Sequence, residues 1–219
     1  MGRRPARATE APSLVATLNR AAPTIVFEPA GHVYTVDGVL TPSVTQIIRP
    51  ITGFIPRALK DAGAERGNLV HQACEFIDAG FEADVDPSVA NYGKAYKSFL
   101  SDSGFVVLKS EYRVANPPAR YAGTIDRVGR FRDEPDTYIL DIKSGEMAFW
   151  MPLQLAAYAY GYWLMESGDA KVRLPKCMVL QLSEDGTYKV HEISDIEAAF
   201  DAFMALVRYH RWHQGVTGR

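Results

Sequence analysis

The segment Leu140-Asp141-Ile142-Lys143-Ser144-Gly145 decides how the chain is organised. Together with the apolar residues 138–139 before it, this segment is typical of a β-strand that ends in a polar turn. Side chains alternate between the two faces of a strand, so Asp141 and Lys143 share one face and Ile142 points into a core. The pair is either a surface ion pair, which contributes little to stability, or a metal ligand beside a cation that handles the metal's water.

The composition limits the class of protein. The chain has 219 residues, 47% of them hydrophobic, which is enough for one globular domain with a core. The formal net charge of -2 gives no global attraction to nucleic acid, so any such binding depends on local patches. Two cysteines, Cys74 and Cys177, are too few for a disulfide framework, which predicts a reducing compartment. No apolar run approaches the roughly 18–20 residues that span a bilayer, and residues 1–12 lack the apolar stretch of a secretory signal.

Periodicity along the chain predicts a mixed central β-sheet flanked by helices, an α/β or α+β fold. We expect residues 1–23 to form a flexible basic arm and residues 24–219 a single domain. Asp37-Gly38 indicates a hairpin turn, and Ser43 or Thr41 is expected to cap a short helix. Further helices are predicted over 56–79, 87–101, 152–166 and 196–212, and strands over 105–114, 121–131, 138–143, 177–182 and 188–193.

The predicted turns fix which residues lie opposite each other in the sheet. A turn centred on Asp133-Glu134 pairs residues whose numbers sum to about 267, which places Asp126 opposite Asp141. A turn centred on Pro118-Ala119 pairs residues whose numbers sum to about 237, which places Glu111 opposite Asp126. Directly opposed side chains point to the same face, although a slip of one residue would move a carboxylate to the other face.

Three carboxylates side by side repel one another. At about 5 Å and an effective dielectric near 20, each adjacent pair costs roughly 3 kcal/mol. Lys143 supplies one positive charge against three negative ones, so a divalent cation is needed to balance the rest. Carboxylate oxygens suit Mg²⁺ or Mn²⁺ and do not suit a soft metal.

The pattern resembles the PD-(D/E)xK nuclease superfamily in its RecB-like, phage-type exonuclease branch. The residues that carry the resemblance span 66–158 in the order of the family, and they are Arg66-Gly-Asn-Leu-Val-His71, Gly123-Thr-Ile-Asp126, Asp141-Ile-Lys143-Ser-Gly145 and Gln154-Leu-Ala-Ala-Tyr158. The segment from Tyr34 to Thr45 is also similar to the front of phage-type members. The second acid here is the shorter Asp141 where the family commonly has Glu, and it is still able to bind a metal.

The resemblance implies a metal site and its ligands. Asp126 and Asp141 would be the central ligands, with the backbone carbonyl of Ile142 adding an oxygen. His71 would be a further ligand, and Glu111 would be the extra acidic residue of many members. From the sequence alone, His71 could equally be a hydrogen-bonded histidine on a partly buried helix.

The resemblance also assigns roles around the metal. Lys143 would position or deprotonate the attacking water. Gln154 and Tyr158 would orient Lys143 or a phosphate, and the alternative is that they are only a pair on a helix surface. Nucleic acid contacts are expected from Arg66, Arg113, Arg120, Arg127 and Ser144. Phe149 and Trp150 are interpreted as core or interface aromatics, with stacking on a base as the alternative.

The function implied is a metal-dependent DNA exonuclease without sequence specificity, acting in phage or bacterial DNA recombination, repair or processing. The cofactor would be Mg²⁺, with Mn²⁺ as a substitute and no iron–sulfur cluster, because the cysteine cluster of some relatives has no counterpart. DNA would be the partner, and a single-strand annealing or binding protein could be a second one. An oligomer is compatible with this function, and no contact with a membrane is expected. The location would be the cytoplasm of a bacterial or phage-infected cell. A structure-specific or nicking endonuclease and a non-catalytic nucleic-acid-binding module are the alternatives.

Overall fold

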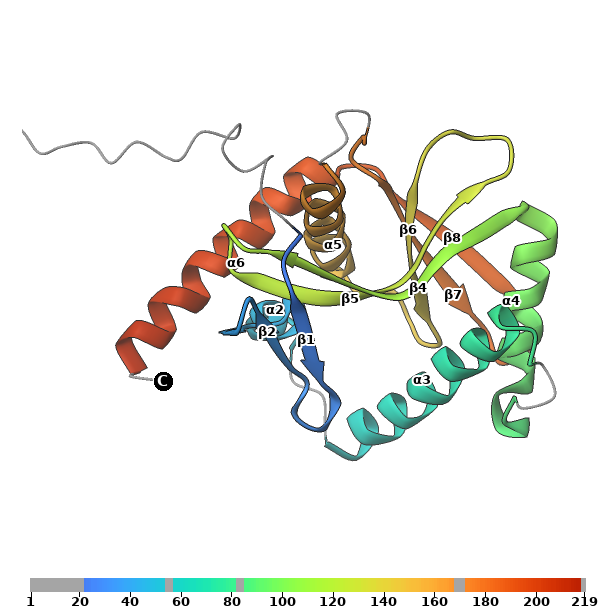
Figure 1. The fold of residues 1–219 in the computed structure, drawn as a ribbon. Helices are drawn as coiled ribbons and strands as arrows, with labels where there is room; N and C mark the ends of the chain where they lie inside the picture. Colours follow the sequence, from blue (N-terminus) through green and yellow to red (C-terminus); the bar gives the residue numbers. More distant parts are fainter. Residues whose placement is uncertain (1–21, 54–56, 82–84, 168–171, 218–219) are drawn as a thin grey trace, which may run out of the picture.

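Two β-sheets and the helices around them make up the fold (Figure 1). The computed structural model describes residues 22–53, 57–81, 85–167 and 172–217, so the predicted N-terminal arm lies almost entirely outside it. The large sheet has the order β4-β5-β6-β7-β8 and the small sheet the order β1-β2-β3. Their strands are β1 (Ile25–Glu28), β2 (Val33–Val36), β3 (Val39–Thr41), β4 (Phe105–Asn116), β5 (Tyr121–Phe131), β6 (Tyr138–Lys143), β7 (Lys176–Leu182) and β8 (Tyr188–Ile193).

The large sheet is mixed, which confirms the predicted fold class. Its neighbouring strands are antiparallel except β6 and β7, which run parallel because a crossover containing α5 connects them. The α-helices are α2 (Val44–Ile48), α3 (Arg57–Asp78), α4 (Ala90–Ser103), α5 (Met151–Glu166) and α6 (Ile196–Thr217), and the short 3₁₀ helices are η1 (Pro29–Gly31), η2 (Arg49–Ile51) and η4 (Pro87–Val89). Among the described helices, none is long and apolar enough to cross a lipid bilayer.

Each face of the large sheet is covered by its own group of helices. α5 packs on one face together with α2 and α6, and its buried Leu155 shares a core with Ile125 of β5 and Phe203 of α6. On the other face, α3 and α4 cover Leu140 and Ile142 of β6 (Figure 1). Because helices cover both faces, every residue of β6 from Tyr138 to Ile142 is buried, the charged Asp141 included, and only Lys143 at its end is partly exposed.

The small sheet is attached to the edge of this core beside β5. Its hairpin turn is made by Asp37 and Gly38, both with positive φ (51° and 77°), as the Asp-Gly pair predicts. Ser43 then caps α2 through a capping box with Gln46. The backbone N–H of Ala122 donates to Pro42 O at 3.0 Å, which joins the small sheet to β5.

The register of the large sheet agrees with the prediction from its turns. Arg127 of β5 pairs with Leu140 of β6, so partner numbers sum to 267. From Lys109 onward, partners in β4 and β5 sum to 237, and a bulge between Val107 and Lys109 shifts this sum by one toward the start of β4. The sheet therefore brings the segments that carry the three predicted acids level with one another.

Candidate metal and active site

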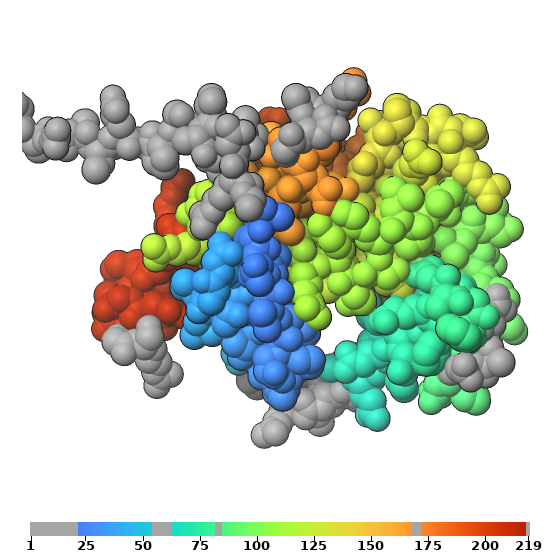
Figure 2. Space-filling view, viewed as in Figure 1, coloured from blue at the N-terminus to red at the C-terminus, as the bar shows by residue number. Residues whose placement is uncertain are grey.

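A cavity of about 570 Å³ opens between the small sheet, α3 and the large sheet. Its walls come from β1, η1 and β2 on one side and from α3 on the other, and its floor comes from β4, β5, β6 and α5. Figure 2 shows this hollow between β1 in blue and α3 in teal, below β4 in green. Seven residues predicted as catalytic or metal-binding line this cavity, from elements that are far apart along the chain: His71, Glu111, Asp126, Asp141, Lys143, Gln154 and Tyr158.

His71, Glu111 and Asp126 form a group that can hold a metal ion. One ligand atom from each lies within 4.8 Å of those of the other two. His71 Nδ1 is 3.7 Å from Asp126 Oδ2, and the imidazole is about one-quarter exposed. His71 reaches the group from α3, so the helix closes the cavity over the strands that carry the two acids.

Glu111 occupies its place through an unusual backbone. The pairs on either side of it are in register, which puts Glu111 opposite Asp126 as predicted, but its φ is 46°. A left-handed conformation of a residue other than glycine costs about 1–3 kcal/mol and is typical of functional sites. Burial, together with the negative charge of Asp126, raises the pKa of Glu111 from its ordinary value of 4.5 to about 7.

Asp141 and Lys143 form a second group on the cavity floor. Lys143 Nζ lies 2.6 Å from Asp141 Oδ2, and the Asp141 side chain is almost fully buried. Burial raises the pKa of Asp141 against the opposing effect of Lys143. Burial disfavours the charged form of Lys143, but Asp141 and Asp126 outweigh it and raise the pKa of Lys143 above its ordinary value. The lysine is therefore a cation in this arrangement.

A hydrogen bond connects the two groups. The backbone N–H of Ile142 donates to Asp126 Oδ2 at 2.6 Å, so the carboxylate reaches across to the strand that carries Asp141 and Lys143. The Ile142 side chain is fully buried on the face that α3 and α4 cover, in a core as predicted. Both groups consequently face one cavity.

Gln154 and Tyr158 of α5 complete the floor and are not a surface pair. Both are buried, and Gln154 Nε2 lies 3.0 Å from Tyr158 Oη and 3.4 Å from Asp141 Oδ1. Tyr158 passes over Gly123 of β5 at a distance that leaves no room for a side chain there, since a Cβ at Gly123 would be 2.5 Å from the Tyr158 ring. This close approach explains the glycine in the Gly-Thr-Ile-Asp segment.

The donor set fits a divalent cation. Carboxylate oxygens and one imidazole are ligands of divalent metal ions, and the described residues place no thiol in the cavity. Asp141 Oδ2 is buried, and its partner among the described residues is the Lys143 ammonium at 2.6 Å. A buried carboxylate oxygen facing other carboxylates has unused coordination capacity.

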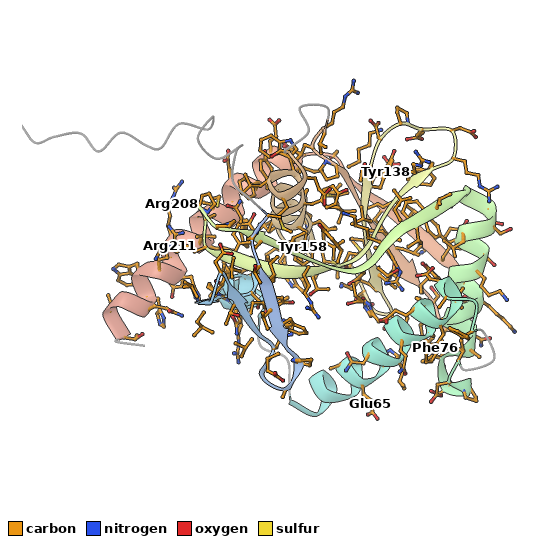
Figure 3. The ribbon with its side chains drawn as sticks, viewed as in Figure 1. Glu65, Phe76, Tyr138, Tyr158, Arg208 and Arg211 are labelled. Atoms are coloured by element: carbon orange, nitrogen blue, oxygen red, sulfur yellow. The ribbon has the colours of Figure 1, made fainter. Side chains whose placement is uncertain are left out.

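The predicted nucleic acid contacts divide into four cases. Arg113 lines the cavity, whereas Arg66 and Ser144 are not among its lining residues. Arg120 lies at the β4–β5 turn, next to Ala119, whose carbonyl accepts a 2.6 Å hydrogen bond from Arg211 of α6 (Figure 3). The expectation for Arg127 is wrong, because its side chain is fully buried and paired with Asp78. As the neighbour of Asp126, Arg127 points to the opposite face of β5, beneath α3 and α4.

No role in the site was predicted for several other residues of the cavity. Phe27, His32 and Tyr34 come from the small sheet and η1, and Asn68 from α3. Thr124 lies two residues before Asp126 on β5 and therefore shares its face. Only Thr124 could have been predicted from this alternation, because nothing in the sequence pattern relates the small sheet to the acids.

Comparison with known proteins adds only a likeness of fold. Neither a protein-family model nor a curated protein matches the chain. Among solved structures, the chain is similar to an alkaline exonuclease (LHK-Exo) from Laribacter hongkongensis, with a TM-score of 0.34 and 13% identity over 81% of this chain and 93% of that chain. A structure of LHK-Exo in complex with dAMP gives a TM-score of 0.33 and 14% identity with the same coverage. Values this low do not assign an activity.

Proposed function

We propose that the protein is a divalent-metal-dependent DNA exonuclease that hydrolyses phosphodiester bonds without sequence specificity. One observation carries the proposal: the group His71, Glu111 and Asp126 shares a cavity with the buried pair Asp141 and Lys143. A surface ion pair needs neither an adjoining acidic group nor burial. The arrangement is suited to hold a cation next to a second, protein-borne positive charge.

The metal and the protein divide the chemistry between them. Asp126, Glu111, His71 and Asp141 would hold the cation, which when bound supplies a nucleophile from water at neutral pH and neutralises charge on the phosphate. Lys143 is held as an ammonium by Asp141, so it stabilises negative charge that develops on the phosphoryl oxygens.

The remaining cavity residues position these groups. Gln154 holds the orientation of Asp141, and Tyr158 braces Gln154 from one turn further along α5. Arg113 offers a guanidinium to a phosphate of the bound strand. A phosphate contact of this kind carries no sequence information, which favours hydrolysis without sequence specificity. Mg²⁺ is the expected ion, with Mn²⁺ as a substitute.

The test is a cleavage assay on end-labelled linear, nicked and closed circular DNA with Mg²⁺, Mn²⁺ or EDTA. We expect cleavage of linear DNA with either ion and no cleavage in EDTA. Cleavage in EDTA would contradict the metal mechanism, and cutting of closed circles would contradict the exonuclease mode. Asp133→Asn, in the exposed turn between β5 and β6, is a matched control for carboxylate substitutions in the site.

A further inference from the structure

We propose that Phe27, His32 and Tyr34, here called the aromatic wall, form a subsite that stacks an unpaired nucleobase of the substrate strand. The inference deepens the proposed nuclease function and rests on it, because it identifies the substrate as a single strand or a frayed end. All three residues line the same cavity as Asp126 and Asp141. Phe27 and Tyr34 come from the small sheet, and His32 is the residue between η1 and β2, on the wall of the cavity opposite α3.

The three rings support one another. The ring centroids of Phe27 and Tyr34 are 4.6 Å apart, and those of His32 lie 5.2 Å from Phe27 and 5.6 Å from Tyr34. Tyr34 is buried and backs the other two, whereas Phe27 is partly exposed and His32 exposed. The wall therefore combines a buried tyrosine, which supports it from behind, with two aromatic side chains that a ligand can reach.

His32 is held at the cavity by a backbone that disfavours most side chains. Its φ is 48°, and its N–H donates to Pro29 O at the end of η1. A left-handed residue other than glycine costs about 1–2 kcal/mol. This turn fixes the direction from which the exposed imidazole reaches the cavity.

The aromatic wall is tied to the acidic group at a defined spacing. Tyr34 Oη and Thr124 Oγ1 share a hydrogen bond of 2.8 Å, and Thr124 lies two residues before Asp126 on β5. At about 3.3–3.4 Å per residue, the Cα atoms of Thr124 and Asp126 are about 7 Å apart, and the two side chains lie on one face of the strand. A base stacked on the wall is then near enough to belong to the nucleotides whose phosphate lies at the acids.

Arg113 provides charge between these two parts of the cavity. Its guanidinium carbon is 5.8 Å from the Phe27 ring centroid, within cation–π range. A guanidinium beside a ring can bind the phosphate of the nucleotide whose base stacks on that ring. Stacking of this kind needs a free π-face, which a base inside a duplex does not offer, so the wall selects unpaired bases.

The experiment measures the fluorescence of 2-aminopurine in oligonucleotides with Ca²⁺ in place of Mg²⁺. One probe is single-stranded, and the other carries the 2-aminopurine paired at the centre of a blunt duplex. We expect saturating protein to quench the single-stranded probe and not the duplex probe. Phe27→Leu and His32→Asn should abolish most of the quenching at saturation, and asparagine is chosen because it tolerates the left-handed backbone. Phe81→Leu, an exposed phenylalanine that does not line the cavity, is the matched control.

Kinetics give a second reading. With Mg²⁺, Phe27→Leu and His32→Asn should raise KM for single-stranded DNA about tenfold, as expected for one lost stacking contact, with kcat changed by less than about twofold. Thermal unfolding midpoints of both variants should match the wild type, which separates loss of stacking from loss of structure. The proposal would be overturned if the two variants quench the single-stranded probe as strongly as the wild type does. It would also be overturned if saturating wild-type protein does not quench this probe.

The proposed subsite and the proposed hydrolysis fail in different ways. Quenching by a protein that cleaves no DNA would retain the subsite and reject the nuclease function. Cleavage by a protein that quenches no probe would retain the nuclease function and reject the subsite.

Discussion

Arg127 bends its guanidinium back over the residue before it, and its Nη1 donates a 2.6 Å hydrogen bond to the backbone carbonyl oxygen of Asp126. Its Nε lies 2.5 Å from Asp78 Oδ2, and Nη1 is 3.5 Å from Glu111 Oε1. Asp78 is the last residue of α3, the helix that carries His71. One fully buried guanidinium thus connects the three elements that supply the acidic group and its histidine.

Removal of Arg127 should cost both stability and metal binding. Arg127→Met leaves the largely buried Asp78 carboxylate without its cation, so we expect a loss of about 3 kcal/mol in the free energy of unfolding. Urea denaturation in EDTA measures this loss, and calorimetric titration with Mn²⁺ measures the weaker binding that follows from a displaced Glu111. Arg130→Met, an exposed position on the same strand, should change neither quantity.

A double-mutant cycle shows whether the effect belongs to the pair. Asp78→Asn alone should also destabilise, because it leaves Arg127 buried and unpaired. The combined Arg127→Met and Asp78→Asn variant should lose less than the sum of the two single losses. Simple additivity would mean that the ion pair does not carry the coupling.

The pKa of Glu111 predicts how the metal-free protein responds to pH. The unfolded chain releases this proton near pH 4.5, and the folded chain near pH 7, so the folded state holds more protons between these values. Stability in EDTA should therefore fall as pH rises from about 4.5 to 7 and then level off, as far as Glu111 contributes.

Glu111→Gln isolates this contribution from other titrating groups. The variant and the wild type should unfold alike near pH 4, and the variant should become the more stable one as pH rises toward 8. Thermal unfolding in EDTA across this range gives the difference directly. A wild type that is more stable than the variant at pH 8 without metal would show that the carboxylate is not penalised in the fold.

The register of the sheet could be predicted from sequence because turn residues are recognisable and strands have a constant period of two. The turns at Asp133-Glu134 and Pro118-Ala119 therefore placed Glu111 and Asp126 correctly. The left-handed backbone of Glu111 is a local departure that this period does not encode. Strand alternation already put Arg127 on the face opposite Asp126, but only tertiary packing reveals that α3 and α4 bury that face.

The aromatic wall could not be predicted from the sequence. Phe27 and His32 reach the cavity because Pro42 and Ala122 join the small sheet to β5. That attachment is a contact between segments about 80 residues apart, and neither segment carries a periodic signal for it. Local patterns predict elements and their pairing within a hairpin, whereas the docking of one sheet on another depends on side-chain shape.

Gly123 should be intolerant of even a methyl group. In Gly123→Ala the new Cβ would meet the Tyr158 ring at 2.5 Å, and overpacking of this kind costs about 1–3 kcal/mol. If the ring moves, Gln154 loses its contact with Tyr158 Oη and no longer holds Asp141. We expect cleavage to fall at least about tenfold, because small displacements of positioned groups are costly.

Two further variants separate packing from chemistry at this position. Adding Tyr158→Leu to Gly123→Ala makes room for the methyl group, so the melting temperature should recover while cleavage does not. Gly215→Ala, on α6 with open space around it, should leave cleavage unchanged. Recovery of cleavage in the double variant would show that Tyr158 acts only by filling space.

Asp141 is the most direct test of where the metal binds. Asp141→Asn keeps the shape of the side chain and its contact with Gln154 Nε2, and it removes the charge that faces Lys143 and the cation. We expect cleavage to fall at least about a hundredfold, in line with the loss of one preorganised electrostatic group, while circular dichroism and DNA binding stay close to the wild type. Asp141→Glu keeps the charge on a longer side chain and should retain measurable cleavage with weaker Mn²⁺ binding. An active Asp141→Asn variant would place the metal on His71, Glu111 and Asp126 alone and leave Asp141 only as the partner of Lys143.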